Sequence, residues 1–216
     1  MIDFERAKAA FEEYLKDYDR EDDKIRLKIV HTYYVVDCVE NIVRRMGLSV
    51  EERMLGMLIG LLHDIGRFEQ IKRYDSFMPD TMDHAAYGAA LLFGKKKEIR
   101  RFIKDDKWDA VIETAIAKHS DFRLEGVEGE QALLHARLIR DADKLDNCRV
   151  KLEESLETLL GVPSHEPLEG KISPAVWEAC MQEKSVLSSD RRTKADYWIS
   201  YIAQIYDVNF PATFSI

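Results

Sequence analysis

The feature that most constrains the fold is a run of nine apolar residues that ends on a histidine and an aspartate. Residues 54–62 read MLGMLIGLL, and His63 and Asp64 follow directly. The capping-box pattern at residues 49–52 (SVEE) precedes the run, so the pattern predicts an apolar helix that reaches His63. An apolar helix gives a dry, rigid support to an imidazole and a carboxylate, which are both good ligands for a divalent metal ion.

The length and composition indicate one large globular unit. The chain has 216 residues, of which 46% are hydrophobic, and contains only 10 Gly and 5 Pro. Such a chain can bury a sizeable core in one domain, or in one domain with a small appendage. The nine-residue apolar run is far too short to span a membrane, and residues 1–19 are acidic and amphipathic rather than signal-like. We therefore expect a cytoplasmic protein without a membrane partner.

The charge and the cysteines exclude several classes of protein. The net charge of -8 and the pI near 5.4 disfavour binding to a nucleic-acid backbone, so a small anionic substrate would need local positive charge. The three cysteines, Cys38, Cys148 and Cys180, are widely spaced and form no Cys-x-x-Cys pair. This spacing argues against a disulfide framework and a zinc ribbon, and we interpret all three as small core residues.

Helical periodicity covers most of the chain, and no alternating strand pattern of useful length occurs. Besides the apolar helix, we predict helices at Lys24–Met46, His84–Phe93, Lys107–Lys118, Glu130–Leu160, from Pro174, and at Lys194–Tyr206. Gly66 marks the expected exit from the apolar helix, and residues 68–82 are a candidate lid or pocket wall. Residues 161–174 hold three of the prolines and read as a loop. The predicted fold class is all-α, with a helical core and N-terminal helix at residues 1–160, and with the loop and C-terminal helices of residues 161–216 packed on the same domain.

Four of the six histidines and one distant aspartate fall at helix ends or on apolar helix faces. His31 lies within the first long helix, His84 begins a helix, His119 ends one, and Asp143 lies midway along the longest. A buried carboxylate is costly unless it is paired or metal-bound, so the set as a whole indicates a metal site in the core of the bundle. Asp141 lies about 200° round the helix from Asp143, so only one of the two can be a ligand.

These residues and their neighbouring motifs resemble a known family. His31, then His63-Asp64, then Asp143 is similar to the H…HD…D pattern of the HD superfamily of metal-dependent phosphohydrolases, which are all-helical. Residues 62–67 (LHDIGR), Asp83-His84 with Gly88, Lys118-His119 and residues 142–145 (ADKL) resemble the local motifs of that family. The resemblance extends from about Lys24 to Val150 and leaves the helices after residue 161 outside it.

The resemblance implies an HD-domain helical bundle with two divalent metal ions in its core. His31, His63, Asp64 and Asp143 would hold the first ion, and Asp64 would bridge to a second ion held by His84 and His119. Nitrogen and oxygen ligands without a thiolate favour iron or manganese, with cobalt, nickel, magnesium or zinc as alternatives.

The resemblance also implies catalytic roles around Asp64. Arg67 and Lys144 are candidate phosphate contacts, and Asp121 is a candidate for handling a proton or supporting a ligand.

The implied activity is cleavage of a phosphate ester or anhydride in a small, nucleotide-like substrate. Two alternatives remain open: an HD-type di-iron oxygenase, and a catalytically silent, nucleotide-sensing helical domain. The state of assembly is also open, because the aromatic C-terminal helix around Trp198, Tyr201 and Tyr206 could pack on its own domain or on a partner.

Overall fold

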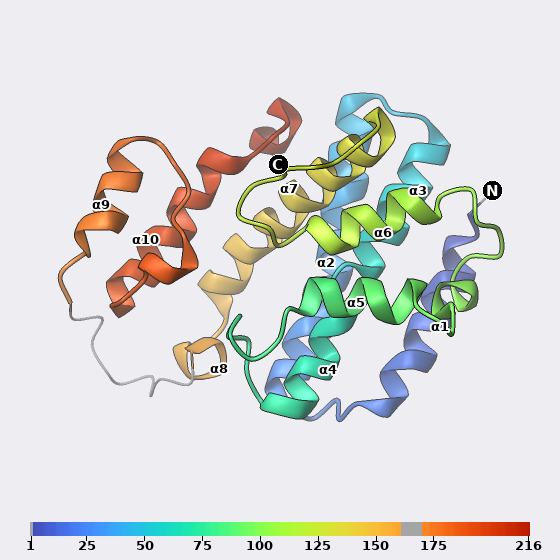
Figure 1. The fold of residues 1–216 in the computed structure, drawn as a ribbon, viewed down its shortest axis with the longest axis horizontal. Helices are drawn as coiled ribbons and strands as arrows, with labels where there is room; N and C mark the ends of the chain where they lie inside the picture. The colour runs from blue at the N-terminus through green and yellow to red at the C-terminus, as the bar shows by residue number, and fades with distance from the viewer. Residues whose placement is uncertain (1, 161–169) are drawn as a thin grey trace.

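The computed structural model describes residues 2–160 and 170–216, which form α-helices joined by turns and loops and contain no β-strand (Figure 1). The all-α prediction is therefore confirmed. In chain order the helices are α1 (Phe4–Tyr14), α2 (Asp23–Met46), α3 (Val50–Leu62), α4 (Ile65–Tyr74), α5 (His84–Phe93), α6 (Asp109–Lys118), α7 (Glu130–Glu153), α8 (Leu156–Leu160), α9 (Pro174–Met181) and α10 (Lys194–Ile202). No helix in these described residues is both long and apolar enough to cross a membrane.

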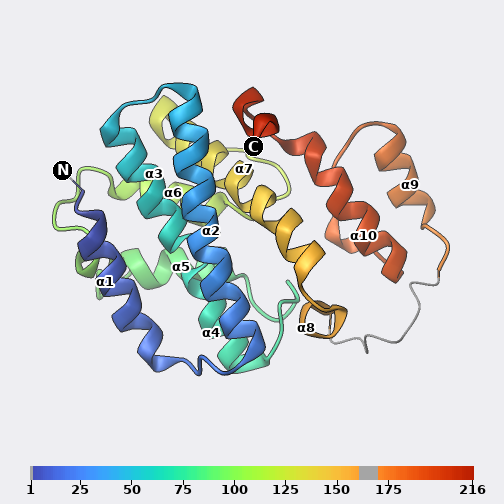
Figure 2. The same cartoon turned by 180° about the vertical axis from the view of Figure 1, so that it is seen from behind.

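Helix α2 forms the centre of the bundle, with α3 and α7 packed against it (Figures 1 and 2). Val35, Val39 and Ile42 have no exposed surface, so this helix contributes to the core along much of its length. The side chain of Asp22 caps its first turn, and Gly47 ends it with a positive φ of 67° that suits glycine.

The turn after His63 differs from the sequence prediction. Gly66 does not mark the exit from helical structure, because α4 begins one residue earlier, at Ile65. A Cβ atom on Gly66 would lie 2.2 Å from the carbonyl oxygen of His84, so this glycine allows the starts of α4 and α5 to meet. Within residues 68–82, Phe68 is fully buried in α4, whereas Phe77, Pro79 and Met82 line the cavity described below, so only the later part of this range forms a pocket wall.

The long helix predicted to reach Leu160 ends earlier. Helix α7 stops at Glu153 because Glu154 is extended, with φ -91° and ψ 152°. The Oγ atom of Ser155 then accepts a hydrogen bond from the amide of Thr158, which begins α8 as a new helix. The helix predicted from Lys107 begins at Asp109, and that predicted to Tyr206 ends at Ile202 and continues as a 3-10 turn.

The C-terminal segment, residues 170–216, lies beside α7 in both views (Figures 1 and 2). The buried carboxylate of Asp141 accepts hydrogen bonds from the amides of Asn209 and Phe210 and from the hydroxyl of Thr213. Helix α9 begins at Pro174 as predicted, whereas residues 161–169 of the predicted loop lie outside the described residues. The interpretation of the cysteines as core residues is wrong for Cys148, which is exposed on α7.

Candidate metal centre

Five segments of the chain bring the six predicted ligands to one place. His31 comes from α2, His63 and Asp64 from the junction of α3 and α4, His84 from the first residue of α5, His119 from the end of α6, and Asp143 from α7. All four histidines and Asp64 are buried. The carboxylate of Asp64 lies at the middle of the group, so the site divides into two sides, one at each of its oxygens.

The first side faces Oδ2 of Asp64. The Nε2 atoms of His31 and His63 lie 3.7 Å and 3.6 Å from this oxygen. Oδ1 of Asp143 lies 3.1 Å from His31 Nε2 and 3.7 Å from His63 Nε2. Two imidazoles and two carboxylates from three segments therefore surround one small volume. We call His31, His63 and Asp143 the Oδ2 side of the centre.

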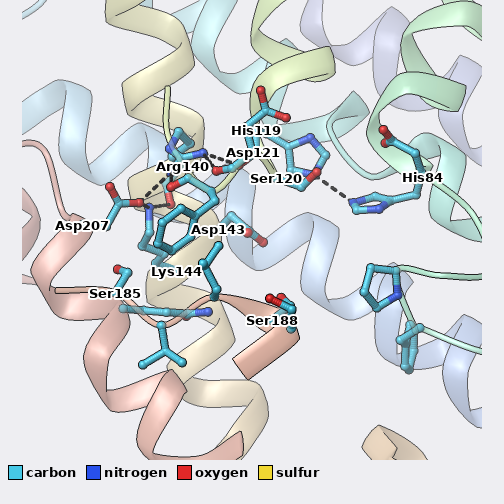
Figure 3. Close-up of a pocket in the computed structure, with 18 of the residues that line it drawn as sticks. His84, His119, Ser120, Asp121, Arg140, Asp143, Lys144, Ser185, Ser188 and Asp207 are labelled. Atoms are coloured by element: carbon cyan, nitrogen blue, oxygen red, sulfur yellow. Dashed lines mark hydrogen bonds and ion pairs between the residues drawn. The ribbon is translucent and has the colours of Figure 1, made fainter. Parts of the chain in front are cut away.

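The second side faces Oδ1 of Asp64. The Nε2 atoms of His84 and His119 lie 3.2 Å and 3.5 Å from this oxygen and 3.2 Å from each other. Figure 3 shows these two rings facing one another at the edge of a pocket. We call His84 and His119 the Oδ1 side. One carboxylate thus has an oxygen within reach of each histidine pair, as a ligand that bridges two ions requires.

Hydrogen bonds on the outer nitrogens orient three of the imidazoles. Nδ1 of His31 lies 2.6 Å from Oδ2 of Asp146, and Nδ1 of His63 and His119 lies 2.8 Å and 2.7 Å from the carbonyl oxygens of Gly60 and Ile116. Carbonyl and carboxylate oxygens require Nδ1–H as the donor, which leaves the Nε2 lone pair directed toward the centre.

The inner nitrogens of His31 and His63 are buried and have no hydrogen-bond partner among the described residues. Unpaired buried polar atoms are rare and costly in folded proteins. Two such atoms directed at the same carboxylates are suited to bind a cation, and the nitrogen and oxygen donors suit a divalent transition metal.

The expected charge states also suit a metal. Burial would raise the pKa of Asp64, but the charge of Lys28 and the adjacent imidazoles lower it well below its usual range. The pKa of Asp143 is also well below its usual range, because the adjacent imidazoles of His31 and His63 outweigh the effect of burial. Burial lowers the pKa of His84 to about 3, and the nearby Arg67 acts in the same direction. Anionic carboxylates and a neutral imidazole are the forms that bind metal ions.

The predicted catalytic residues Arg67, Lys144 and Asp121 also lie at this site, and each contacts a different group. The guanidinium of Arg67 donates to Nε2 of His84 at 2.9 Å and to the carbonyl oxygen of Phe77 at 3.2 Å. Nζ of Lys144 lies 2.8 Å from the carboxylate of Asp207, so this lysine already has an anionic partner. Asp121 borders the pocket, and its carboxylate lies 3.0 Å from Nζ of Lys118.

Two side chains at the centre had no role in the sequence analysis. Nζ of Lys28 lies 2.7 Å from Oδ2 of Asp64, and Asp146 supports His31. Each had a local signal, because Lys28 precedes His31 by three residues and Asp146 follows Asp143 by three, which places them on the same helix faces.

Arg140 and Asp207 also support the site, and they are distant from each other in the sequence. Arg140 donates hydrogen bonds to the carbonyl oxygens of His119 and Asp121 and to the carboxylate of Asp207. Asp207 follows Arg140 by 67 residues, so no local pattern could have joined the two.

A cavity of about 670 Å³ opens onto the Oδ1 side of the centre. His84, His119 and Asp143 form its inner end, and Ser185 and Ser188 of the C-terminal segment form part of its opposite wall (Figure 3). A volume of this size can hold a small organic ligand. The cavity therefore gives a substrate access to the position between the two histidine pairs.

The fold and the site together define an all-helical protein whose core presents clusters of histidine and aspartate that could hold metal. In agreement, a family model described as HD domain matches residues 29–148, which is more than half of the 216-residue chain. The chain belongs to the HD-domain family, whose members are generally metal-dependent phosphohydrolases. Comparisons with curated proteins and with solved structures found no match.

Proposed function

We propose that the protein is a phosphohydrolase with two divalent metal ions, which cleaves a phosphate ester or anhydride of a small, nucleotide-like substrate. The observation that carries the proposal is the position of Asp64, whose two oxygens each lie within 3.7 Å of the inner nitrogens of a different histidine pair. Bound metal ions would lower the pKa of a coordinated water and neutralise phosphoryl charge as the P–O bond breaks.

The protein's own residues would hold the substrate in the cavity beside these ligands. Arg67 borders both this cavity and the ligand His84, so its guanidinium can contact a phosphoryl oxygen at the Oδ1 side. Lys144 is a weaker candidate than the sequence suggests, because Asp207 already neutralises it. Asp121 borders the same cavity and remains our candidate for accepting a proton.

The test is metal analysis and hydrolysis measured on the same protein, purified without chelator. We expect about two ions per chain, with iron or manganese favoured, and release of phosphate from at least one compound in a panel of nucleotides, dinucleoside polyphosphates and phosphomonoesters. Removing the metal with a chelator should abolish hydrolysis, and adding Mn²⁺ should restore it.

The same preparation distinguishes the alternatives. Dioxygen consumption by an iron-loaded protein that is inactive with Mn²⁺ would replace the phosphohydrolase by a di-iron oxygenase. A protein that binds nucleotides but turns over none of the panel with any metal would be a sensing domain.

A further inference from the structure

The cleft continues from the metal centre toward the C-terminal segment. A second hollow of about 180 Å³ shares Arg67 and Phe77 with the large cavity and reaches Lys151 and Tyr201. A third, of about 540 Å³, shares Phe77 and Tyr201 with the second and reaches Arg191. The three hollows form one cleft, with α2 and α7 on one wall and the C-terminal segment on the other.

Lysines from the two central helices meet in this cleft. Nζ of Lys28 on α2 contacts Asp64 at 2.7 Å, and Nζ of Lys151 on α7 lies 4.2 Å from the ring centre of Tyr201. Burial lowers the pKa of Lys151 to about 8, and the charges of Lys28, Arg191 and Arg67 contribute in the same direction, against the opposing charge of Asp143. Lys28 and Lys151 line the second hollow together, and Arg191 lines the third hollow, which shares Tyr201 with the second.

Two of these cations have no carboxylate partner within residues 2–160 and 170–216. Lys151 and Arg191 form no ion pair there, and the guanidinium of Arg191 lies over the ring of Tyr197 at 4.8 Å. On the neighbouring wall, by contrast, Arg140 and Lys144 share the carboxylate of Asp207. Two partly buried cations that lack a paired carboxylate are unfavourable, and they are unexpected in a chain with a net charge of -8.

We propose that Lys151 and Arg191 form a second anion subsite, which holds a phosphoryl group next to the one at the metal centre. The proposal rests on the proposed function and names its substrate class: an organic compound with two or more consecutive phosphoryl groups, rather than a phosphomonoester. The third hollow, beside Tyr197 and Tyr201, is the space for the organic part of this substrate. Arg191 lies outside residues 29–148, so the C-terminal segment supplies part of the subsite.

The test compares two phosphonates by calorimetry on the manganese-loaded protein. Methylphosphonate can occupy only the metal centre, whereas methylenediphosphonate offers a second anionic group and is not hydrolysed. We expect the wild type to bind methylenediphosphonate at least about tenfold more tightly, and Lys151→Met and Arg191→Met each to reduce this preference by about tenfold. Lys96→Met is the matched control, because it removes one positive charge from an exposed loop and should keep the wild-type preference.

A further variant separates charge from packing. Lys151→Arg keeps the positive charge, so it should retain most of the preference that Lys151→Met loses. An unchanged preference in both Lys151→Met and Arg191→Met would mean that the metal centre alone holds the diphosphonate, and would overturn the subsite.

The outcomes also separate this proposal from the proposed function. If the wild type hydrolyses phosphomonoesters while the preference is insensitive to both variants, the function stands and the subsite is refuted. If the preference depends on Lys151 and Arg191 while no phosphate compound is hydrolysed with any metal, the subsite stands and the function is refuted.

Discussion

The two sides of Asp64 differ in how firmly the protein holds their ligands. On the Oδ2 side, His31 and His63 are fully buried, the first within α2 and the second at the end of α3, and Asp146 and Gly60 orient their rings. On the Oδ1 side, His84 and His119 lie at helix ends beside the cavity, and His84 also accepts a hydrogen bond from Arg67.

We infer from this difference that the two proposed ions are bound with different affinities. The Oδ2 side is preorganised, which favours tight binding of a permanent ion. The Oδ1 side borders the cavity, and its ligand His84 also accepts a hydrogen bond from Arg67, our candidate phosphate contact. An ion on this side should therefore exchange more readily. Asp64 belongs to both sides and couples them.

The largest expected effect is that of removing the shared carboxylate. Asp64→Ala takes one ligand from each ion and leaves their mutual repulsion uncompensated, so the variant should lose both ions and all phosphate hydrolysis. Metal analysis and turnover on one preparation check this. Asp75→Ala, which removes an exposed carboxylate from the end of α4, is the control and should behave as the wild type. Wild-type activity in Asp64→Ala would end the hydrolase proposal.

The next effect compares the two sides directly. His84→Ala should lose the ion of the Oδ1 side and keep about one ion per chain, since the ligands of the Oδ2 side are untouched. His31→Ala should lose the tightly held ion, and the metal content of this variant should fall below that of His84→Ala. Both variants should be inactive. Equal metal contents in the two variants would remove the proposed difference between the sides.

A smaller effect is expected from the residue that orients His31. Asp146→Ala removes the acceptor at Nδ1 of His31, and loss of such a supporting bond weakens metal affinity by about 10- to 100-fold. Competition with a chelator measures this affinity. Glu153→Ala is the matched control, because it removes the other carboxylate that binds Arg149 without touching His31. Equal metal affinity in the two variants would show that the contact of Asp146 with His31 does not support metal binding.

Changes at Arg67 should affect turnover while leaving the metals in place. The planar guanidinium offers two donors to phosphoryl oxygens, so Arg67→Ala should lower kcat/KM by roughly ten- to a hundredfold, the loss of about one charged hydrogen bond. Arg67→Lys should retain the charge but still show a measurable loss. Unchanged kcat/KM in Arg67→Ala, with an intact metal content, would move the phosphate contact to Lys118, Arg123 or Lys144.

The smallest effect concerns His135, a buried histidine outside the centre. His135 pairs with Glu52 at 2.6 Å, and burial lowers its pKa. The unfolded chain therefore takes up a proton below about pH 6.5 that the folded state excludes, so this histidine makes the protein lose stability as the pH falls below that value. His135→Gln should give a shallower decrease in Tm between pH 7 and 5, with the metal content unchanged. Loss of metal in this variant would show that any buried histidine supports the centre.

The sequence predicted the parts of the molecule that depend on local pattern. The apolar run ending on His63-Asp64 and the helical periodicity around His31 and Asp143 predicted both the all-α fold class and the grouping of the ligands. Asp141 and Asp143 were separated correctly in direction, since Asp141 binds the C-terminal segment while Asp143 faces the histidines.

What the sequence could not predict depends on contacts between distant segments. The ion pair between Lys144 and Asp207 joins residues 63 positions apart. Gly66 lies in α4 rather than at a helix exit, and a larger residue there would collide with the carbonyl oxygen of His84. The break between α7 and α8 was missed because no glycine or proline marks it; Ser155 begins the new helix through a side-chain cap.

The most direct test of the central claim is anomalous diffraction from crystals of protein produced with manganese and without chelator. The account predicts two peaks, one on each side of Asp64, each at a metal–ligand distance of roughly 2.0–2.6 Å from the carboxylate. The first should also contact His31, His63 and Asp143, and the second His84 and His119. The absence of any peak in contact with Asp64, or a single peak held without the histidines, would contradict the account.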